Sequence, residues 1–432
     1  MMFFFYDILL YAIAPVYFPL MALSQMMRGK KRLGVRERFG FFGPGFFAAK
    51  KNKRVWFHAV SVGETLAAVP LVLALKEKAP EIEIYFSTVT ETGNKVAGEK
   101  LGDAARIFFF PFDFGAVVRR VIGQMSPDIF VVVETEIWPN LLKALHDKGI
   151  PSLVVNGRIS ARSFKGYSRF GFFFRHVLPL VSRYMMQSEG DAERIIRLGA
   201  PPERVSVAGN IKFDQAIAAN RPASTRAALG ISEGAKVFIA GSTHQGEEDE
   251  ALSAYKELLI DFPDMVMLLA PRHPERFAAA EDAVRRAGFQ CVRKSAGAHF
   301  IAPGSVILLD TMGELAGTYA VGDINFVGGS WADIGGHNIL EPASFAKPVF
   351  FGSVIHNFKD ISRILKDCGA GIEVKDGAEL AAEAKKLLRD PARYATLGHA
   401  ALEAIEQNKG ALAKDLKAVE EFIMHEEICP FQ

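Results

Sequence analysis

Two acidic segments carry the residue types that acid–base catalysis requires. In the first, HAVSVGET at residues 58–65, a strand pattern changes into a helix pattern and places Glu64 in the first helical turn. A carboxylate at that position can remove a proton from a hydroxyl group. The helix dipole favours the ionised form of Glu64 and so weakens it as a base, and an acidic residue is also common at a helix start. A catalytic and a purely structural interpretation of Glu64 both stay open at this point.

The second acidic segment, ETE at residues 134–136, directly follows the apolar run 129–133. While the chain stays extended, Glu134 and Glu136 share one face. Two acids at the end of a buried strand are costly unless a ligand or a basic partner compensates their charge. Arg158 or Lys212 could be a structural ion-pair partner, so function and ion pairing have equal weight here. No His or Asp stands beside the two acids at ligand spacing, which disfavours a metal site.

A basic and aromatic stretch forms the third candidate. Residues 158–175 contain no acidic residue and interleave six aromatic side chains with Arg158, Arg162, Lys165, Arg169 and Arg175. Cations among aromatic rings suit a phosphate-bearing amphiphile at a membrane surface. A partly buried basic helix is the structural alternative. Nucleic acid is disfavoured because the rest of the chain has no matching basic field and no known binding module.

Four short motifs of the second half are typical of a nucleotide site. APRHPER at 270–276 offers the Arg272 guanidinium to a phosphate, and TMGE at 311–314 offers backbone amides to an anion. The glycines of GGS at 328–330 and GGHNILEP at 335–342 allow a ligand to approach the backbone, and Glu341 can accept hydrogen bonds from ribose hydroxyls. Each motif is weak alone, but all follow predicted strands. The chain has no P-loop and no GxGxxG motif after a first strand, which disfavours an ATPase or an NAD dehydrogenase.

The elements that must position these residues alternate between apolar, β-branched runs and longer amphipathic stretches, which predicts an α/β protein with parallel sheets. The expected strands are 55–60, 82–87, 106–111, 129–134, 152–156, 184–187 and 205–208, then 237–241, 265–270, 306–309, 324–327 and 349–351. The polar, alanine-rich segment between the two groups reads as a connector. We therefore expect two doubly wound domains that face a cleft, with ligands beyond the C-terminal strand ends.

The N-terminus predicts a membrane anchor. Residues 8–27 contain no charged side chain, and an apolar helix of about 20 residues can span a bilayer. Arg28, Lys30, Lys31 and Arg32 follow, which places the body on the cytoplasmic side by the positive-inside rule. A cleaved signal peptide would carry its positive charge before the apolar stretch. Two prolines within the stretch leave a full span and a dip into one leaflet as alternatives.

Composition excludes several classes of protein. The 432 residues are 50% hydrophobic and 23% charged, which is typical of globular domains and not of disordered or fibrous chains. The formal net charge of +2 provides no strong field toward nucleic acid. Three widely spaced cysteines exclude a disulfide scaffold and a zinc knuckle, so a reducing compartment fits best.

Several of these motifs, taken together, closely resemble one family. HAVSVGET, ETEIWPN, NGRISARS, GNIKFD, APRHPER, TMGEL, FVGGS and GGHNILEP occur in this order behind the apolar N-terminus. This series resembles the 3-deoxy-D-manno-octulosonic acid (Kdo) transferases of lipopolysaccharide synthesis, over nearly the whole chain. The resemblance implies a membrane-anchored GT-B glycosyltransferase with two Rossmann-like domains, CMP-Kdo as donor and a lipid A precursor of the lipid IVA type as acceptor. It also implies inversion at the sugar, with neither metal nor cofactor.

The resemblance further implies roles for individual residues. Glu64 corresponds to the general base, and Glu134 and Lys212 correspond to residues that stabilise the transition state. The expected CMP contacts are Pro271, Arg272, Met312, Gly313, Glu314, Asn338, Ile339, Leu340 and Glu341. The expected acceptor or membrane surface consists of Arg158, Arg162, Lys165 and Arg169.

The expected organisation is an anchor at 1–27, an acceptor-binding domain at 28–213, a linker at 214–230, a CMP-Kdo-binding domain at 231–410 and a helical tail at 411–432. The expected location is the cytoplasmic side of the cell inner membrane, and no protein partner can be deduced. Another GT-B nucleotide-sugar transferase or epimerase is the nearest alternative function, and a non-catalytic lipid-binding membrane protein is an alternative of a different class.

Overall fold

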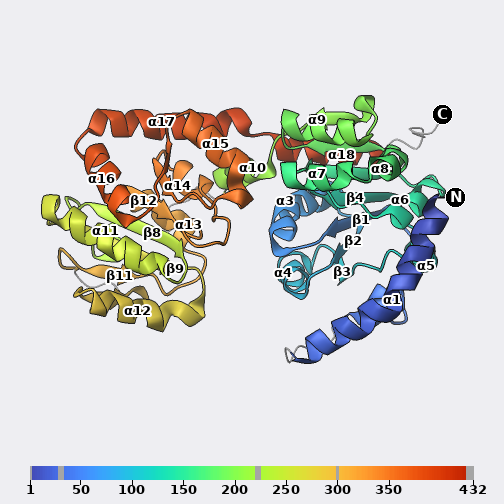
Figure 1. Ribbon diagram of the computed structural model, residues 1–432, viewed down its shortest axis with the longest axis horizontal. Helices are drawn as coiled ribbons and strands as arrows, with labels where there is room; N and C mark the ends of the chain where they lie inside the picture. Colours follow the sequence, from blue (N-terminus) through green and yellow to red (C-terminus); the bar gives the residue numbers. More distant parts are fainter. Residues whose placement is uncertain (1, 28–33, 219–224, 298–300, 425–432) are drawn as a thin grey trace. The chain divides into compact units, whose positions relative to one another are not determined.

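The chain divides into two compact units. The computed structural model describes residues 2–27, 34–218, 225–297 and 301–424 (Figure 1). The first unit comprises Met1–Ile211 together with Lys409–Gln432, and the second comprises Lys212–Asn408. The basic residues that follow the predicted anchor, at positions 28–32, lie outside the described residues.

The first unit is built on a seven-stranded parallel sheet with the order β3-β2-β1-β4-β5-β6-β7. Its strands are β1 (Arg54–Ala59), β2 (Glu83–Thr88), β3 (Arg106–Phe109), β4 (Ile129–Val133), β5 (Ser152–Gly157), β6 (Arg183–Met186) and β7 (Val205–Val207). The central strands are apolar without interruption because helices cover both faces of the sheet. In β1, Val55 and Phe57 belong to the core on one face and Trp56 to the core on the other.

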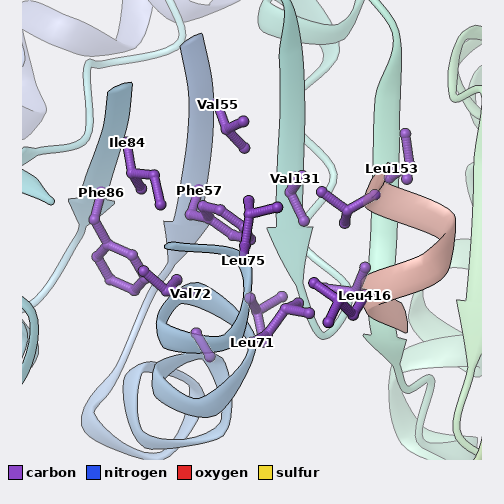
Figure 2. Packing of buried hydrophobic residues seen from close by; sticks show 14 of the residues in the cluster. Val55, Phe57, Leu71, Val72, Leu75, Ile84, Phe86, Val131, Leu153 and Leu416 are labelled. Atoms are coloured by element: carbon purple, nitrogen blue, oxygen red, sulfur yellow. The ribbon is translucent and has the colours of Figure 1, made fainter. Parts of the chain in front are cut away.

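Helices of the first unit pack on both faces of this sheet. They are α2 (Val35–Arg38), α3 (Val62–Lys78), α4 (Glu91–Leu101), α5 (Gly115–Met125), α6 (Pro139–His146), α7 (Ala161–Ser168), α8 (Gly171–Val177), α9 (Glu189–Leu198) and α18 (Ala411–Met424). Helices α3, α4 and α18 share one core, and α5, α6, α8 and α9 share the other. Figure 2 shows Leu416 of α18 beside Leu71 and Leu75 of α3 in the first of these cores.

The second unit repeats the architecture with the strand order β10-β11-β9-β8-β12-β13-β14, also parallel. Its strands are β8 (Val237–Thr243), β9 (Val266–Pro271), β10 (Cys291–Arg293), β11 (Val306–Leu308), β12 (Ile324–Val327), β13 (Val349–Phe351) and β14 (Gly371–Glu373). Its helices are α11 (Glu247–Asp261), α12 (Phe277–Arg286), α13 (Leu315–Thr318), α14 (Leu340–Ala343), α15 (Lys359–Asp367), α16 (Gly377–Leu388) and α17 (Pro391–Asn408).

Each strand predicted from the sequence corresponds to an observed strand. The sequence pattern missed β10 and β14, which are edge strands of three residues each and too short to show a period. Helix α10 (Ile211–Ala218) crosses the division between the units and occupies the start of the segment predicted as a linker. The segment predicted as a separate tail contributes α18 to the first unit, because Leu416 and Val419 complete the core beside α3.

The apolar N-terminal helix α1 (Met2–Met27) is attached to the rest of the first unit by polar groups near its start and by aromatic rings such as Phe18, which packs on Phe112. Asp7 Oδ1 accepts hydrogen bonds from the Gly115 amide and from Asn140 Nδ2, both at 3.0 Å, and the Tyr6 hydroxyl donates to Asp113 at 3.2 Å. Residues 2–20 are long and apolar enough to cross a membrane. Outward-facing side chains such as Leu9 are more than half exposed.

Replacing Leu416 by alanine should lower the free energy of unfolding by about 2–5 kcal/mol, because Leu416 fills the core between α18 and α3. Urea unfolding followed by tryptophan fluorescence measures the loss, since Trp56 and Trp138 lie in the first unit. Leu73→Ala on the exposed side of α3 is the matched control and should cost less than about 1 kcal/mol. Equal effects of the two substitutions would contradict the packing role of α18.

Candidate active site

The strand order of the first sheet brings the two acidic segments together. Strands β1 and β4 are direct neighbours, with His58 opposite Val132, and the chain order reverses between them. Glu64 follows β1 and Glu134 follows β4, so both carboxylates stand at the C-terminal edge of the sheet, at its switch point. Parallel sheets bind ligands at this place.

Glu64 lies in the first turn of α3 and is held by two hydrogen bonds. Its Oε2 accepts from the Val60 amide at 2.5 Å, and its Oε1 accepts from the Ser61 hydroxyl at 3.1 Å. Burial and the nearby charge of Glu134 nevertheless raise the pKa of Glu64 to about 7, against the effect of those hydrogen bonds. A carboxyl group with a pKa near neutrality is suited to accept and release a proton.

The second acidic segment departs from the extended conformation on which the sequence argument relied. Strand β4 ends at Val133, and Glu134 has a φ of +60°, in the left-handed region that non-glycine residues rarely adopt. The Glu134 amide still donates to the Val155 carbonyl at 3.0 Å. Burial, together with the charges of Glu64 and Glu134, raises the pKa of Glu136 to about 7. The carboxyl groups of Glu64, Glu134 and Glu136 therefore form one cluster. The sequence argument for Glu134 and Glu136 assumed an extended chain, and the backbone at Glu134 does not have that conformation.

The two basic residues considered as partners of these acids take different places. The Arg158 amide donates to Thr135 Oγ1 at 3.0 Å, which ties the end of β5 to the acidic segment of the first unit. Lys212 lies in the second unit, where its ammonium group is 4.2 Å from the centre of the Phe358 ring.

The basic and aromatic stretch forms α7 and α8. Arg162, Lys165 and Arg169 are exposed, whereas several of the interleaved rings, Tyr167 among them, pack against the core. Burial raises the pKa of Tyr167 and the charge of Glu136 raises it further, so α7 borders the carboxylate cluster. Phe170 and Phe172 remain exposed at 60% and 68%. The stretch thus combines both interpretations, since one side is core and the other is a cationic, aromatic surface.

A cavity of about 590 Å³ between α1 and the body of the first unit was not predicted from the sequence. Its wall is mainly apolar and aromatic, and Arg38 and Glu91 are charged residues at its lining. The other lining residues include Leu10, Ile13, Tyr17, Phe18, Phe110, Phe112, Phe114 and Trp138. The available signal in the sequence was the alternation of Phe110, Phe112 and Phe114, because alternate residues of an extended segment face the same side.

The glycine-rich loop of the second unit is organised by a buried glutamate that sequence reasoning missed. Glu247, 2% exposed at the start of α11, accepts hydrogen bonds from five backbone amides. Their donors are His244, Gly329, Ser330, Trp331 and Ala332, at 2.7–3.2 Å. A Cβ at Gly328 would lie 2.8 Å from Glu247 Oε2, which explains that glycine. In the sequence, the GEE motif at residues 246–248 could have pointed to this glutamate, because it stands at a helix start shortly after a strand.

The predicted nucleotide contacts lie around the same sheet edge. Pro271 ends β9 and Arg272 follows it as an exposed cation. Met312 is 59% exposed and Gly313 has a φ of +85°, so this turn presents backbone to solvent. Glu314 forms an ion pair with Lys294, which gives its carboxylate a structural partner.

The last predicted segment contributes backbone and two polar side chains. The side chains of Ile339 and Leu340 are fully buried in the core, so only their backbone groups can face a ligand. Asn338 Nδ2 donates to Glu341 Oε1 at 3.3 Å. Burial raises the pKa of Glu341 to about 7, although the Asn338 hydrogen bond and the charge of Arg272 oppose the rise. Within the residues that the structure describes, no group of three or more His, Cys, Asp or Glu side chains is arranged to hold a metal ion.

The raised pKa of Glu136 predicts a pH-dependent stability difference. A carboxyl group that titrates near 4.5 in the unfolded chain and near 7 in the folded protein loses stabilisation as the pH rises between these values. The variant Glu136→Gln lacks this titrating group. Its free energy of unfolding, relative to that of the native protein, should therefore increase by about 1–3 kcal/mol between pH 4.5 and pH 8. Urea unfolding at both pH values measures the change. Exposed Glu99→Gln should give no pH-dependent difference, and a flat Glu136→Gln profile would refute the buried cluster.

Comparisons with known proteins identify the family of the chain. A family model described as 3-deoxy-D-manno-octulosonic-acid transferase (kdotransferase) matches residues 33–215. The chain is 34% identical to the 3-deoxy-D-manno-octulosonic acid transferase of Haemophilus influenzae, over 97% of this chain and 98% of that protein. It is also 34% identical to the transferase of that name from Bordetella pertussis, over 91% of this chain and 93% of that protein.

Solved structures of low identity show the same fold. UDP-GlcNAc 2-epimerase from Neisseria meningitidis superposes with a TM-score of 0.58 at 14% identity, over 86% of this chain and 99% of that one. MurG of Acinetobacter baumannii gives 0.55 at 11% identity, over 86% and 100%. The two parallel-sheet units therefore constitute a GT-B fold. By its similarity to the full-length relatives, the chain belongs to the 3-deoxy-D-manno-octulosonic acid transferases, the glycosyltransferases that act in lipopolysaccharide biosynthesis.

Proposed function

We propose that the protein transfers Kdo from CMP-Kdo to a lipid A precursor of the lipid IVA type, with inversion and without a metal, and that Glu64 is the general base. The observation that carries the proposal is the carboxyl group of Glu64, whose pKa is raised to about 7 at the switch point of the first sheet. A hydroxyl of the acceptor sugar attacks the anomeric carbon of Kdo, the bond to the CMP phosphate breaks, and Glu64 receives the hydroxyl proton.

The environment of Glu64 supports this role. Two hydrogen bonds orient the carboxylate, and partial burial keeps its basicity above that of an exposed glutamate. Glu134 contributes a like charge that raises the pKa of Glu64, so its role in the transition state is to keep the base strong and to favour positive charge at the sugar.

The second unit supplies the donor site in this proposal. Arg272 meets the phosphate, and the turn 312–314 and the segment 338–341 bind the nucleotide through backbone groups and the Glu341 carboxyl. Pro271 shapes the wall beside Arg272. Lys212 lies in the same unit and provides the positive charge that a departing phosphate or the Kdo carboxylate requires. CMP carries a single phosphate, so cationic side chains suffice for it without a metal.

The acceptor is a lipid, and features of the first unit suit a membrane surface. Helix α1 has the length and hydropathy of a membrane span, and α7 presents Arg162 and Lys165 beside the exposed Phe170 and Phe172. We infer that α1 holds the enzyme at the cytoplasmic side of the inner membrane, that the cationic residues around Arg158 and Arg169 meet acceptor phosphates, and that no nucleic acid or partner protein is required.

Glu64→Gln should reduce kcat for Kdo transfer by about 100-fold or more, because the acceptor hydroxyl loses its base. The measurement is product formation from CMP-Kdo and a tetra-acylated lipid A precursor, in the presence of a chelator. In the native enzyme the rate should rise with pH through about 7, since only the ionised carboxylate accepts a proton. Glu189→Gln, at the exposed first turn of α9, is the matched control and should stay active. A fully active Glu64→Gln would exclude this base, and an inert native enzyme would exclude the donor.

Leu9→Lys should weaken membrane association by about 100-fold, because a lysine near the middle of a spanning helix costs roughly 2.5–3.5 kcal/mol. Leu9 faces outward and is 55% exposed, so the substitution leaves the contacts of Asp7 intact. Leu73→Lys on α3 makes the same chemical change on the body and should leave association unchanged. Vesicle co-sedimentation measures both variants, and CMP binding checks that each is folded. Equal sedimentation of the two variants would refute α1 as the anchor.

A further inference from the structure

Two histidines meet at the donor side of the second unit, and neither was singled out by the sequence. His244 follows β8 and His337 lies in the glycine-rich segment that follows β12, the neighbour of β8 in the sheet. Their Nε2 atoms are 2.8 Å apart and their ring planes are nearly parallel, at 4°. A hydrogen bond between two Nε2 atoms requires one ring to donate its Nε2 proton and the other to accept it.

The glycine loop fixes the position of this pair. A Cβ at Gly329 would lie 2.8 Å from Cδ2 and 2.9 Å from Nε2 of His337, so the ring packs directly on the loop backbone. His244 is held from the other side, because its amide donates to Glu247, which also binds the amide of Gly329. The same buried carboxylate thus positions both rings relative to each other.

Charged and titratable groups surround the pair. His337 faces Arg272, His244 and His273, and His244 faces Glu247, His273, Arg272 and Arg276. The ring centres of His244 and His273 are 5.4 Å apart. Burial, together with Arg272 and the neighbouring histidines, lowers the pKa of His337 to about 4. Burial also lowers the pKa of His244, against the effect of the Glu247 charge. The pair is therefore neutral at pH 7 when no anion is bound, although the cations Arg272 and Arg276 lie near it.

An anion bound at this position favours the protonated form of the pair over the neutral form. The neutral pair uses both Nε2 atoms in its own hydrogen bond, which leaves the two Nδ1 atoms as the remaining ring nitrogens. A proton added to the donating ring goes to its Nδ1 and creates an imidazolium N–H that can donate to an oxyanion. The bound anion compensates the charge of the imidazolium and of Arg272 together.

We propose that His244 and His337 form an oxyanion-binding pair of the donor site and take up a proton when the phosphate or carboxylate of the donor binds. This inference rests on the proposed function, because it assumes a cytidine nucleotide as the ligand. The pair makes donor affinity depend on pH: binding strengthens as the pH falls toward the pKa of the free pair, and weakens as the pH rises through the pKa of the bound pair.

Calorimetric titration of the full-length protein in detergent tests the proposal. Binding of cytidine, CMP and CMP-Kdo without acceptor is measured at pH 6.5 in buffers of different ionisation enthalpy, which gives the protons taken up per ligand. Up to about one proton should enter with CMP or CMP-Kdo, and none with cytidine. Because the phosphate of CMP titrates in the same range, the decisive quantity is the difference between the native protein and each variant.

His337→Asn and His244→Asn should each abolish the uptake and weaken CMP binding by about 10-fold to 100-fold at pH 6.5, with a smaller loss at pH 8.5 where the native pair is neutral as well. A purely structural role would give the same loss at both pH values. His273→Asn is the neighbouring control and should retain the uptake.

The outcomes distinguish the phosphate of the donor from its carboxylate as the anion that binds the pair. Uptake with CMP supports the phosphate as the anion, and uptake with CMP-Kdo alone supports the carboxylate. Nucleotide binding without proton uptake, or uptake that disappears in His273→Asn and persists in His337→Asn, overturns the histidine pair and leaves the transferase proposal standing. Failure of every cytidine ligand to bind overturns the proposed donor and the inference with it.

Discussion

The adjacency of β1 and β4 is the constraint on which the first site depends. Neighbouring strands of a sheet are about 4.8 Å apart, so the groups that follow them meet, whereas groups one strand further away would not. Glu64 comes from a helix start after β1, and Glu134 from a turn after β4. The fold thereby forces like charges together in a partly buried place, and the raised pKa of Glu64 and Glu136 is the direct consequence. The left-handed φ of Glu134 is a local cost of this arrangement.

The second unit uses a buried glutamate in the opposite way. Glu247 also follows the first strand of its sheet, but five backbone amides surround it, whereas Glu64 accepts one amide and one hydroxyl hydrogen bond. A carboxyl group with so many donors holds the loop around it in one conformation. The same residue type at equivalent places in two similar sheets is therefore a carboxyl group of raised pKa in one unit and the hydrogen-bonded centre of a loop in the other.

The sequence was sufficient for most of the elements and drew attention to Glu64, Glu134 and Glu136, but it did not show what brings distant segments together. Uninterrupted apolar runs such as 129–133 predicted the buried strands, because burial on both faces requires them. The three-residue edge strands β10 and β14 gave no such signal. The place of α18 in the first unit depends on a core contact of Leu416 across more than 300 positions, and His244 and His337 are 93 positions apart. Such pairings follow from strand order, which local patterns do not encode.

The lone charge of the apolar N-terminal helix has a structural explanation of the same kind. An aspartate within a membrane-spanning segment is costly when it faces lipid. Asp7 avoids that cost, because the amide of Gly115, at the start of α5, and the side chain of Asn140, at the start of α6, both donate to it. The helix dipoles of α5 and α6 favour a negative charge at these ends. Asp7 thus fixes the start of α1 on the body of the first unit, and the apolar cavity lined by Leu10 and Phe114 lies directly beside this attachment.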